Sequence, residues 1–434
     1  MALTDFAIVR RSLRSRMFST CVTSLTVGVA VALMLVLLSM RDSGRQAFAR
    51  GSGNMHLLVS RDSSPMVSIL NGIYYANSPR ASIPWAKYES LAASFPLDFA
   101  IPTQLGDSYR GFPVLATTEE FFSAFEPNID EPWVFEAGGG RAFDKSFEVV
   151  VGSTAAGETG LVVGSKIFLT HGIAQSRQLG QADAMAPHEH REFEYTVVGV
   201  LAPTGSAHDR ALFTALESSW VIHAHDRRKL ADKDIRTTTE ADLLETDRLI
   251  TGIFMRVATR PGQQVTASLQ TVFDQLRRDT SIVVAQPVQQ IDALFAIVSN
   301  IDQVFIAMAA VVMVSSAISI MLALYNSLEQ RRRQIAVLRV LGCSRPRIFG
   351  LLVTEATLIG LLGAGLGVVL AVAGAFAAAA ALKEAIGLVV SPNFGLELTL
   401  AVVTGAVLLS AAAGIIPAIM AYQSSVADHL KPLG

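Results

Sequence analysis

Four long apolar stretches without charged side chains alternate with polar segments along the chain. They lie between Arg16 and Arg41, between Asp302 and Glu329, between Glu355 and Lys383, and between Glu397 and Asp428. A helix of about 20 apolar residues crosses the roughly 30 Å hydrocarbon layer of a membrane. The pattern therefore predicts four transmembrane helices, with a polar segment of about 250 residues between the first and the second.

The first apolar stretch has a second interpretation, as a secretory signal peptide. Four arginines precede it, and Ala47–Ala49 resembles a cleavage site. However, the apolar region of a signal peptide has about 7–15 residues, which is shorter than this stretch. Charged Arg41, Asp42 and Arg45 also separate the stretch from the cleavage-like residues. The sequence favours an uncleaved transmembrane helix.

The short polar segments next to the apolar stretches predict the orientation. The N-terminal tail has four arginines and the loop from Ser327 to Phe349 has six, whereas the loop from Lys383 to Glu397 has one lysine and two glutamates. Cytoplasmic loops carry an excess of Lys and Arg. We therefore expect both termini and the Ser327–Phe349 loop in the cytoplasm, and the long polar segment outside the membrane.

The long polar segment has the patterns of both helices and strands. Trp85–Phe95 and Gln264–Arg278 read as helices, and the predicted strands are Phe147–Val151, Lys166–Thr170, Phe193–Leu201 and Gly252–Val257. The segment contains no cysteine, so it folds without a disulfide. The predicted fold class is an α-helical membrane protein with four transmembrane helices plus a large mixed α+β extracytoplasmic domain, inserted between helices 1 and 2.

The basic loop contains a candidate helix of its own. Gln330–Leu341 has good helix formers, with apolar residues three and four positions apart and arginines on another stripe. Gly342 suits a left-handed helix end, and Ser344 suits the N-cap of the next helix. A positive-inside anchor on anionic lipid explains the arginines. A short amphipathic helix that fits a groove of a partner protein also explains the glycine break and the restart.

Composition indicates a membrane protein, and one glycine-rich segment can be compared with the phosphate-binding loop of ATPases. Hydrophobic residues make up 51% of the chain and charged residues 17%, which is typical of a membrane protein with a large aqueous portion. Gly160–Lys166 lacks the spacing of a phosphate-binding Walker A loop. No serine, histidine and aspartate triad can be assigned from spacing. We expect no cofactor and no enzymatic activity in this chain, and no nucleic-acid partner.

Six of the eight histidines lie between His171 and His225. Histidine and carboxylate side chains bind zinc or copper. His188 and His190 lie in a polar loop, and His223 and His225 share one face if that piece is an extended strand. These four residues are candidate metal ligands; the alternative is that they are solvated loop residues.

Two segments resemble a known family of transporter subunits. Gln334–Gly367 resembles the sequence after the second span of MacB/FtsX/LolE-type ABC transporter permeases, and Pro417–Pro432 resembles the end of those chains. Glu148–Gly172 and Glu194–Gly205 resemble their small β-rich subdomain, with a porter-like subdomain on either side. Leu3–Leu13 resembles their amphipathic N-terminal helix. Several segments of the outer domain resemble a poorly characterised branch without a fused ATPase.

The resemblance implies a domain organisation. Its boundaries are 1–16, cytoplasmic amphipathic helix; 17–41, first transmembrane helix; 42–299, periplasmic domain; 300–328, second transmembrane helix; 329–347, cytoplasmic coupling helix; 348–382, third transmembrane helix; 383–397, periplasmic loop; 398–423, fourth transmembrane helix; and 424–434, cytoplasmic tail.

The resemblance also implies partners and docking residues. A separate ABC ATPase, which holds ATP and Mg²⁺, would dock on the coupling helix, and the permease would pair with a second copy or a related permease in a bacterial inner membrane. A periplasmic protein partner is a further possibility. The ATPase-coupling residues would be Glu329, Arg331, Arg332, Arg333, Ile335, Leu338, Arg339, Leu341 and Gly342.

The implied function is export, extraction or release of cargo at the periplasmic side. The alternatives are an FtsX-like mechanical regulator of a periplasmic enzyme, which transports nothing, and a metal-linked membrane protein based on the histidines. The large outer domain favours cargo handling over a minimal mechanical switch.

The third apolar stretch carries small residues and one carboxylate. Gly363 and Gly367 form a GxxxG pattern and Ala371 extends it, which permits close packing of helices, either within one chain or between two. We expect Glu355 to be an interfacial residue that packs or pairs near the cytoplasmic end of its helix, and not a transport site.

Overall fold

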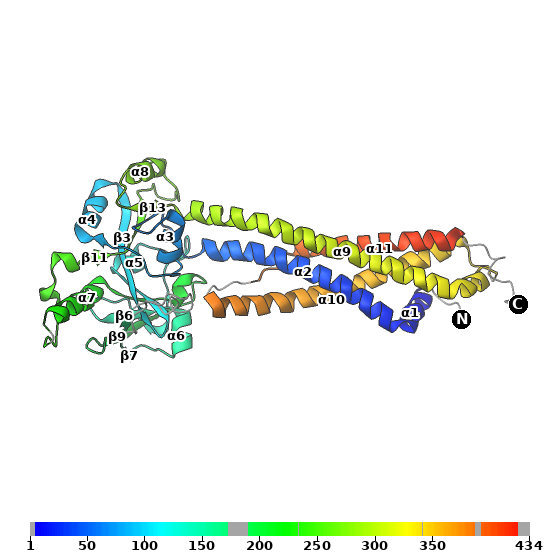
Figure 1. Ribbon diagram of the computed structural model, residues 1–434, viewed down its shortest axis with the longest axis horizontal. Coiled ribbons are helices and arrows are strands. Elements are labelled where there is room, and N and C mark those ends of the chain that lie inside the picture. Colours follow the sequence, from blue (N-terminus) through cyan, green and yellow to red (C-terminus); the bar gives the residue numbers. More distant parts are fainter. Residues whose placement is uncertain (1–4, 172–189, 233, 341, 387–391, 424–434) are drawn as a thin grey trace. The chain divides into compact units, whose positions relative to one another are not determined.

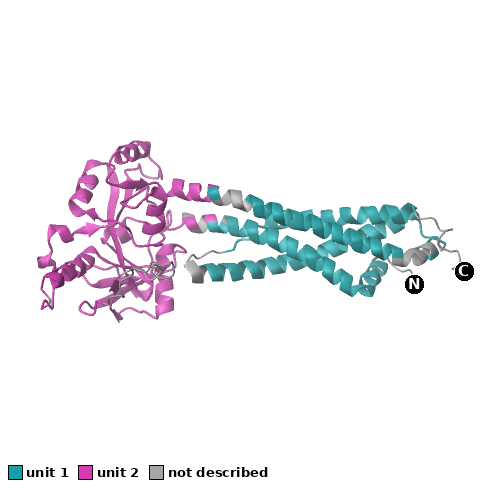
Figure 2. Cartoon of the chain, in the orientation of Figure 1, with its two compact units in different colours: residues 1–44, 297–385, 390–434 teal, residues 45–296, 386–389 magenta. Residues whose placement is uncertain are grey.

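The computed structural model describes residues 5–171, 190–232, 234–340, 342–386 and 392–423. The chain divides into two compact units, coloured separately in Figure 2. One is a helical unit of residues 1–44, 297–385 and 390–434, here called the membrane unit. The other comprises residues 45–296 and 386–389 and is called the outer domain.

Long helices make up the membrane unit. They are α1 (Asp5–Ser15), α2 (Met17–Ala49), α9 (Pro287–Val340), α10 (Arg345–Ile386) and α11 (Leu396–Gln423). Four segments are long and apolar enough to cross a membrane: Met17–Arg45, Gln303–Glu329, Arg345–Leu382 and Leu396–Gln423. They coincide with the four predicted apolar stretches. Their shared core combines valine, leucine, isoleucine and alanine from α2, α9, α10 and α11.

The segment predicted as a separate coupling helix is part of α9. This helix runs without interruption from Pro287 to Val340. The physical reason is in the sequence, because no glycine or proline occurs between Gln303 and Val340 to end the helix. The break predicted at Gly342 is present: this residue has a φ of +95°, and α10 begins at Arg345 directly after Ser344.

The outer domain is a mixed α+β fold, as predicted (Figure 1). Its helices are α3 (Pro65–Gly72), α4 (Trp85–Ser94), α5 (Glu120–Ser123), α6 (Ser153–Thr159), α7 (Leu216–Ala231) and α8 (Leu269–Leu276). Its strands are β1 (Leu57–Ser60), β2 (Ile83–Pro84), β3 (Leu97–Tyr109), β4 (Phe112–Thr117), β5 (Phe135–Gly140), β6 (Glu148–Val151), β7 (Lys166–Ile167), β8 (Thr170–His171), β9 (Tyr195–Leu201), β10 (Leu212–Ala215), β11 (Leu249–Ile250), β12 (Gly252–Val257) and β13 (Val283–Ala285).

One sheet extends through the described part of the outer domain. Its main strand order is β13-β1-β12-β3-β4-β10-β6-β9-β5, and β7 and β8 pair with β9 and β3. The β-rich subdomain and the porter-like subdomain that the sequence predicts therefore share this sheet. Most pairings are antiparallel, whereas β4–β10 and β6–β9 are parallel.

Helices cover both faces of the sheet at β1. Leu57 and Val59 of β1 pack in a core with residues of α4, α7 and α8, whereas Leu58 packs in a second core with residues of α3 and α5. Successive side chains of a strand point to opposite faces of the sheet. This explains why β1 is apolar at consecutive positions, as expected for a strand buried on both sides.

Some predicted elements differ in extent from the observed ones. The strand predicted at Lys166–Thr170 is two short strands, β7 and β8, which pair with different partners. The helix predicted at Gln264–Arg278 is limited to Leu269–Leu276, and that predicted at Leu3–Leu13 is observed as Asp5–Ser15. The boundaries of β12 agree with the prediction at both ends.

Candidate functional site

The predicted ATPase-coupling residues lie on the last turns of α9 and just beyond them. Glu329 and Arg339 are exposed and half-buried, respectively. Arg331, Arg332, Arg333, Ile335 and Leu338 have helical backbone, and Leu341 lies outside the described residues. Val337 and Val340, on the same part of α9, are 48% and 65% exposed. The end of α9 therefore presents apolar side chains at its surface.

The GxxxG glycines of α10 lie against α2 within the same chain. A Cβ added to Gly363 would stand 2.6 Å from the Cβ of Val27, and one added to Gly367 would stand 2.7 Å from the carbonyl oxygen of Gly28. Ala371 is fully buried in the same core. The alternative left open by the sequence, packing within one chain or between two, is thus answered for these glycines: they make room for α2.

The N-terminal helix is attached to the beginning of α10. Arg347 donates to the Asp5 carboxylate, with Nη2 2.6 Å from Oδ1. The Ser12 hydroxyl donates to Oε1 of the buried Glu355 at 2.6 Å. Glu355 therefore has a hydrogen-bond partner within the membrane unit, as expected for a packing residue.

The two helices that connect to the outer domain contact each other at its base. Arg45 near the end of α2 forms an ion pair with Asp292 in the first turns of α9, with 2.7 Å between Nη2 and Oδ1. The Phe48 ring lies 5.6 Å from that of Phe295, edge to face. The Tyr74 hydroxyl donates to the Phe48 carbonyl. We call this contact region the helix junction.

The chain leaves α2 through two glycines that fit closely into the outer domain. Gly51 has a φ of +90°, donates its N–H to the Pro127 carbonyl and accepts from Nε2 of His208 at 2.8 Å. Gly53 has a φ of +50°, and an added Cβ would collide with the backbone carbonyl of Glu126. Neither conformation suits another residue, since L side chains rarely adopt positive φ. The exit from α2 is thereby fixed to the core.

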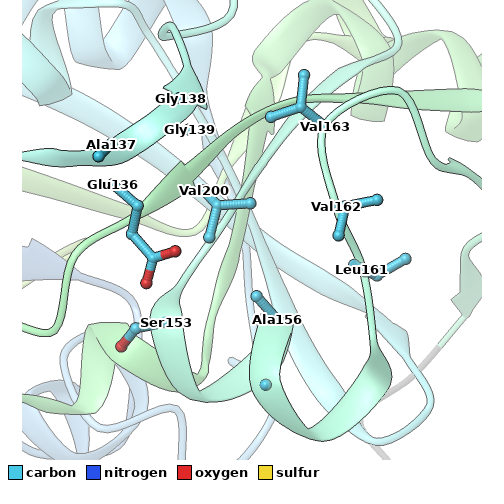
Figure 3. A pocket seen from close by; sticks show the side chains of 11 residues that line it. Glu136, Ala137, Gly138, Gly139, Ser153, Ala156, Leu161, Val162, Val163 and Val200 are labelled. Carbon is cyan, nitrogen blue, oxygen red and sulfur yellow. The ribbon is translucent and has the colours of Figure 1, made fainter.

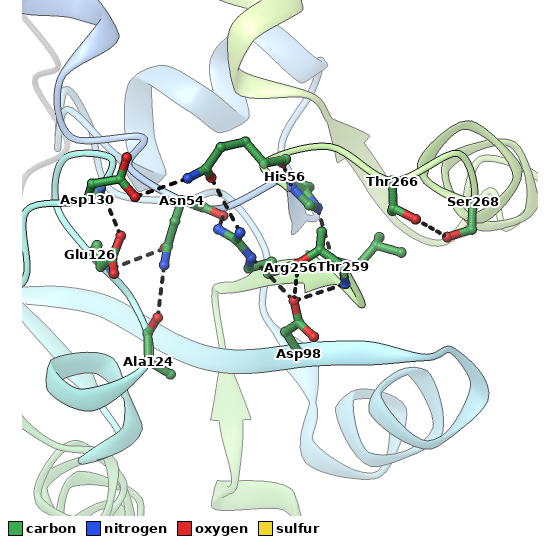
Figure 4. A network of polar contacts seen from close by, with 12 residues as sticks. Asn54, His56, Asp98, Ala124, Glu126, Asp130, Arg256, Thr259, Thr266 and Ser268 are labelled. Atoms are coloured by element: carbon green, nitrogen blue, oxygen red, sulfur yellow. Dashed lines mark hydrogen bonds and ion pairs between the residues drawn. The ribbon is translucent and has the colours of Figure 1, made fainter. Parts of the chain in front are cut away.

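A network of polar contacts continues this attachment (Figure 4). The Asn54 side chain donates to the Ala124 carbonyl and accepts from the Glu126 N–H, and Arg256 donates to the Asn54 carbonyl at 2.8 Å. His56 accepts from the Val257 N–H through Nδ1, so its Nε2–H donates to the Gln264 carbonyl. Burial lowers the pKa of His56, in agreement with this neutral tautomer.

His208 is a buried neutral histidine in the aromatic core. Its Nε2–H donates to Gly51, and its Nδ1 accepts from the Tyr75 hydroxyl at 2.6 Å. Phe121, Phe125 and Trp133 surround the ring. Burial lowers the pKa of His208 from 6.5 to about 4, because the apolar surroundings disfavour the imidazolium. The position of His208 is therefore that of a structural residue.

The outer domain should therefore lose stability in mild acid. Below pH 6.5 the unfolded chain binds a proton at His208 that the folded chain binds only near pH 4, so the free energy of unfolding falls as pH decreases through this range. The expected loss from this residue is about 1 kcal/mol between pH 7 and pH 5.5 and about 3 kcal/mol at pH 4.

The measurement is urea unfolding of the full chain in detergent, followed by tryptophan fluorescence at several pH values. All three tryptophans, Trp85, Trp133 and Trp220, lie in the outer domain. The His208→Gln variant is less stable at pH 7 because it loses packing and hydrogen bonds, but its stability should depend less on pH. An unchanged pH dependence in this variant would contradict the assignment.

The predicted metal-binding histidines are only partly brought together. His223 and His225 lie on helix α7 and not on a strand, so they do not share a face, and that prediction was wrong. The buried His225 packs beside Phe193 and contacts Thr238 through Nδ1. His188 lies outside the described residues. His190 is buried, and its ring centroid lies 6.2 Å from that of His171, a histidine not included in the prediction.

A carboxylate that the sequence did not indicate completes this group. Asp107 of β3 faces His171 of β8 directly across the strand pair, and His171 donates to it from Nδ1 over 3.1 Å. This hydrogen bond raises the pKa of His171, against the effect of burial. The ring of His223 lies 5.7 Å from that of His171.

A pocket of about 470 Å³ lies beside β5 and α6 of the outer domain (Figure 3). Its lining includes Glu136, Gly138, Gly139, Ser153, Val162 and Val200. One carboxylate and one hydroxyl face mainly small and apolar residues. This lining suits a binding surface, since it offers apolar contacts and few polar anchors.

Two family models match the chain. The model of the MacB-like periplasmic core domain matches residues 20–293, and that of the FtsX-like permease C-terminal domain matches residues 306–426. No curated protein sequence matches the chain.

Among solved structures, the chain is similar to the extracellular domain of the noncanonic ABC-type transporter YknZ from Gram-positive bacteria. The identity is 8%, with 53% of this chain and 98% of that chain covered and a TM-score of 0.27. The two family matches together extend from the first candidate span to the last, and the first alone covers more than half of the chain. The chain belongs to the MacB/FtsX-type permeases of ABC transporters.

Proposed function

We propose that this chain is the permease subunit that transmits ATP-driven motion of a separate ATPase to an outer domain on the periplasmic side of a bacterial inner membrane. The outer domain would export, extract or release cargo there. In this orientation both termini and the end of α9 face the cytoplasm. A second copy or a related permease completes the complex.

The continuity of α9 is the observation that carries this proposal. The helix begins two residues after β13, contains the candidate span Gln303–Glu329 and continues through the basic segment to Val340. Its 54 residues correspond to a length of about 80 Å. A continuous helix transmits displacement better than two helices joined by a loop, because its backbone hydrogen bonds resist bending.

The helix junction supports the proposal that motion of the helices reaches the outer domain. The ion pair of Arg45 with Asp292 and the ring contact of Phe48 with Phe295 join α2 to α9 where both connect to the outer domain. Gly51 and Asn54 then attach the exit of α2 to the core. Movement of either helix is thereby passed to the folded domain and not absorbed by a loose linker.

Docking of the ATPase on the predicted coupling residues can be tested by placing a charge among them. Leu338→Asp is expected to abolish co-purification of the ABC ATPase from the natural host in mild detergent, because a carboxylate in an apolar contact costs several kcal/mol. The control is Val265→Asp, which changes an apolar residue that is 66% exposed in the outer domain. Proteins that co-elute are identified by mass spectrometry, and ATP hydrolysis by the complex is measured.

We expect the natural chain and Val265→Asp to retain the ATPase and Leu338→Asp to lose it. Retention of the ATPase and its full activity by Leu338→Asp would show that docking occurs elsewhere. Absence of an ATPase from all three preparations would contradict the proposed transport role.

A further inference from the structure

Three potential metal ligands meet in the outer domain, away from the helix junction. They are Asp107 of β3, His171 of β8 and His190, which follows the segment after β8. One ligand atom of each residue lies within 4.8 Å of one ligand atom of each of the others. We propose that Asp107, His171 and His190 bind a divalent transition-metal ion of the zinc class.

The distances fit such an ion after a small adjustment. Zinc binds histidine nitrogen and carboxylate oxygen at about 2.0–2.2 Å, so the ligand atoms of a tetrahedral site are about 3.3 Å apart. Nδ1 of His171 and Oδ1 of Asp107 are already 3.1 Å apart. The side chain of His171 is 48% exposed and has room to turn toward the other two, which are buried.

The pairing of β3 with β8 explains why two of the ligands are adjacent. Asp107 and His171 are cross-strand partners, which holds their side chains on the same face of the sheet. The hydrogen bond between them turns Nδ1 of His171 and Oδ1 of Asp107 toward each other, and a cation beside the line that joins these atoms would contact both. His171 would bind it as a neutral imidazole whose remaining hydrogen is on Nε2.

Helix α7 supplies groups around the three ligands. Oδ1 of Asp226 lies 3.9 Å from Nδ1 of His190, beyond hydrogen-bond distance, and adds a negative charge beside the ring. His223, one turn before Asp226, has its ring 5.7 Å from that of His171. The remaining coordination position is thus close to an imidazole and accessible from solvent on the side of His171.

The ligand types select the class of metal. Two imidazoles and one carboxylate suit Zn²⁺ and Cu²⁺, whereas Mg²⁺ and Ca²⁺ prefer oxygen ligands alone. Three protein ligands with an open fourth position are typical of sites that exchange a ligand, and closed sets of four are typical of structural zinc. We therefore infer a site that keeps one position for water or another external ligand, and not a closed structural site.

The test uses the full chain in detergent, treated with a chelator and dialysed against Zn²⁺ alone. The natural chain should bind one equivalent. Both His171→Ala and Asp107→Asn should bind at least about 100-fold more weakly, because the loss of a ligand costs more than the loss of an outer-shell partner. His56→Ala is the control, since His56 lies in the polar network next to Asn54.

Co²⁺ provides a second readout that does not depend on protein stability. In the natural chain it should give the intense visible absorption of a four-coordinate site with nitrogen ligands, and in His171→Ala it should not. Circular dichroism checks that each variant is folded. Failure of the natural chain to bind Zn²⁺, or equal binding by His171→Ala, would overturn the proposal, and neither result depends on the ATPase.

Discussion

Replacing Gly53 with alanine is expected to lower the free energy of unfolding of the outer domain by about 2–5 kcal/mol. Two effects add. A φ of +50° is unfavourable for any residue with a Cβ, and the new methyl group would collide with the backbone carbonyl of Glu126. The carbonyl cannot rotate away as a side chain would, since its neighbour Pro127 bonds to Gly51. The loss is a large share of the 5–15 kcal/mol typical of a domain.

The measurement is urea unfolding followed by fluorescence of the three tryptophans, all of which lie in the outer domain. Gly44→Ala is the matched control, because Gly44 is helical and an added Cβ would meet nothing within 4 Å. That variant should be as stable as the natural chain or slightly more stable. Equal unfolding curves for Gly53→Ala and Gly44→Ala would mean that the close fit at the exit from α2 is not rigid.

Replacing Gly367 with leucine should separate α2 from α10. The Cβ alone would stand 2.7 Å from the Gly28 carbonyl oxygen and from the Cβ of Val31, and the rest of the side chain would have no space. Small residues are needed where helix backbones approach this closely in a membrane. Overpacking usually costs about 1–3 kcal/mol. We therefore expect the population of the packed arrangement to fall by about tenfold or more.

Disulfide formation between Val36→Cys and Gly374→Cys reports this packing. A Cβ on Gly374 would lie 3.8 Å from Cγ2 of Val36, so these two positions face each other across the contact between the helices. The two natural cysteines, Cys21 and Cys343, are replaced first. A protease site is introduced within residues 172–189, between the two new cysteines in the sequence. After cleavage, the two fragments stay together on a non-reducing gel only if the disulfide has formed.

The control for this experiment lies on the same helix. An added Cβ on Gly365 would meet nothing within 4 Å, so Gly365→Leu should leave the crosslinking rate unchanged. If Gly367→Leu crosslinks as fast as Gly365→Leu, the contact between α2 and α10 tolerates bulk, and the GxxxG pattern has another purpose.

Local sequence patterns predicted the elements whose signal is confined to one segment. Each of the four apolar stretches contains the helical length needed to cross a membrane, because length and apolarity suffice for that prediction. The boundaries of β12 and the break at Gly342 also followed from nearby residues. A single glycine in the left-handed conformation at the end of a helix is enough to predict where the helix ends.

Predictions failed where two local signals competed. His223 and His225 are two residues apart, which suggested a strand face. However, they lie in the helix α7, Leu216–Ala231, half of whose residues are good helix formers. Similarly, the change from apolar to basic residues at Glu329 suggested a new helix. Polarity does not end a helix, however, and α9 continues to Val340.

The remaining structural features depend on contacts between distant segments, which local sequence patterns do not predict. Asp107 becomes a candidate ligand only because β3 pairs with β8, 64 residues further along the chain. The contact of Phe48 with Phe295 likewise joins residues on opposite sides of the inserted domain. Pairings of this kind are set by the global fold, and a single sequence does not reveal them.

The position of β1 in the sheet has a consequence for how such chains diversify. This first strand of the outer domain lies between β12 and β13, the last two, so both ends of the insertion are fixed at one place. A domain whose ends are adjacent can be exchanged as a cassette without altering the register of the flanking helices. Arg50, which follows α2, and Gln286, which lies between β13 and α9, stand at the two ends of this insertion.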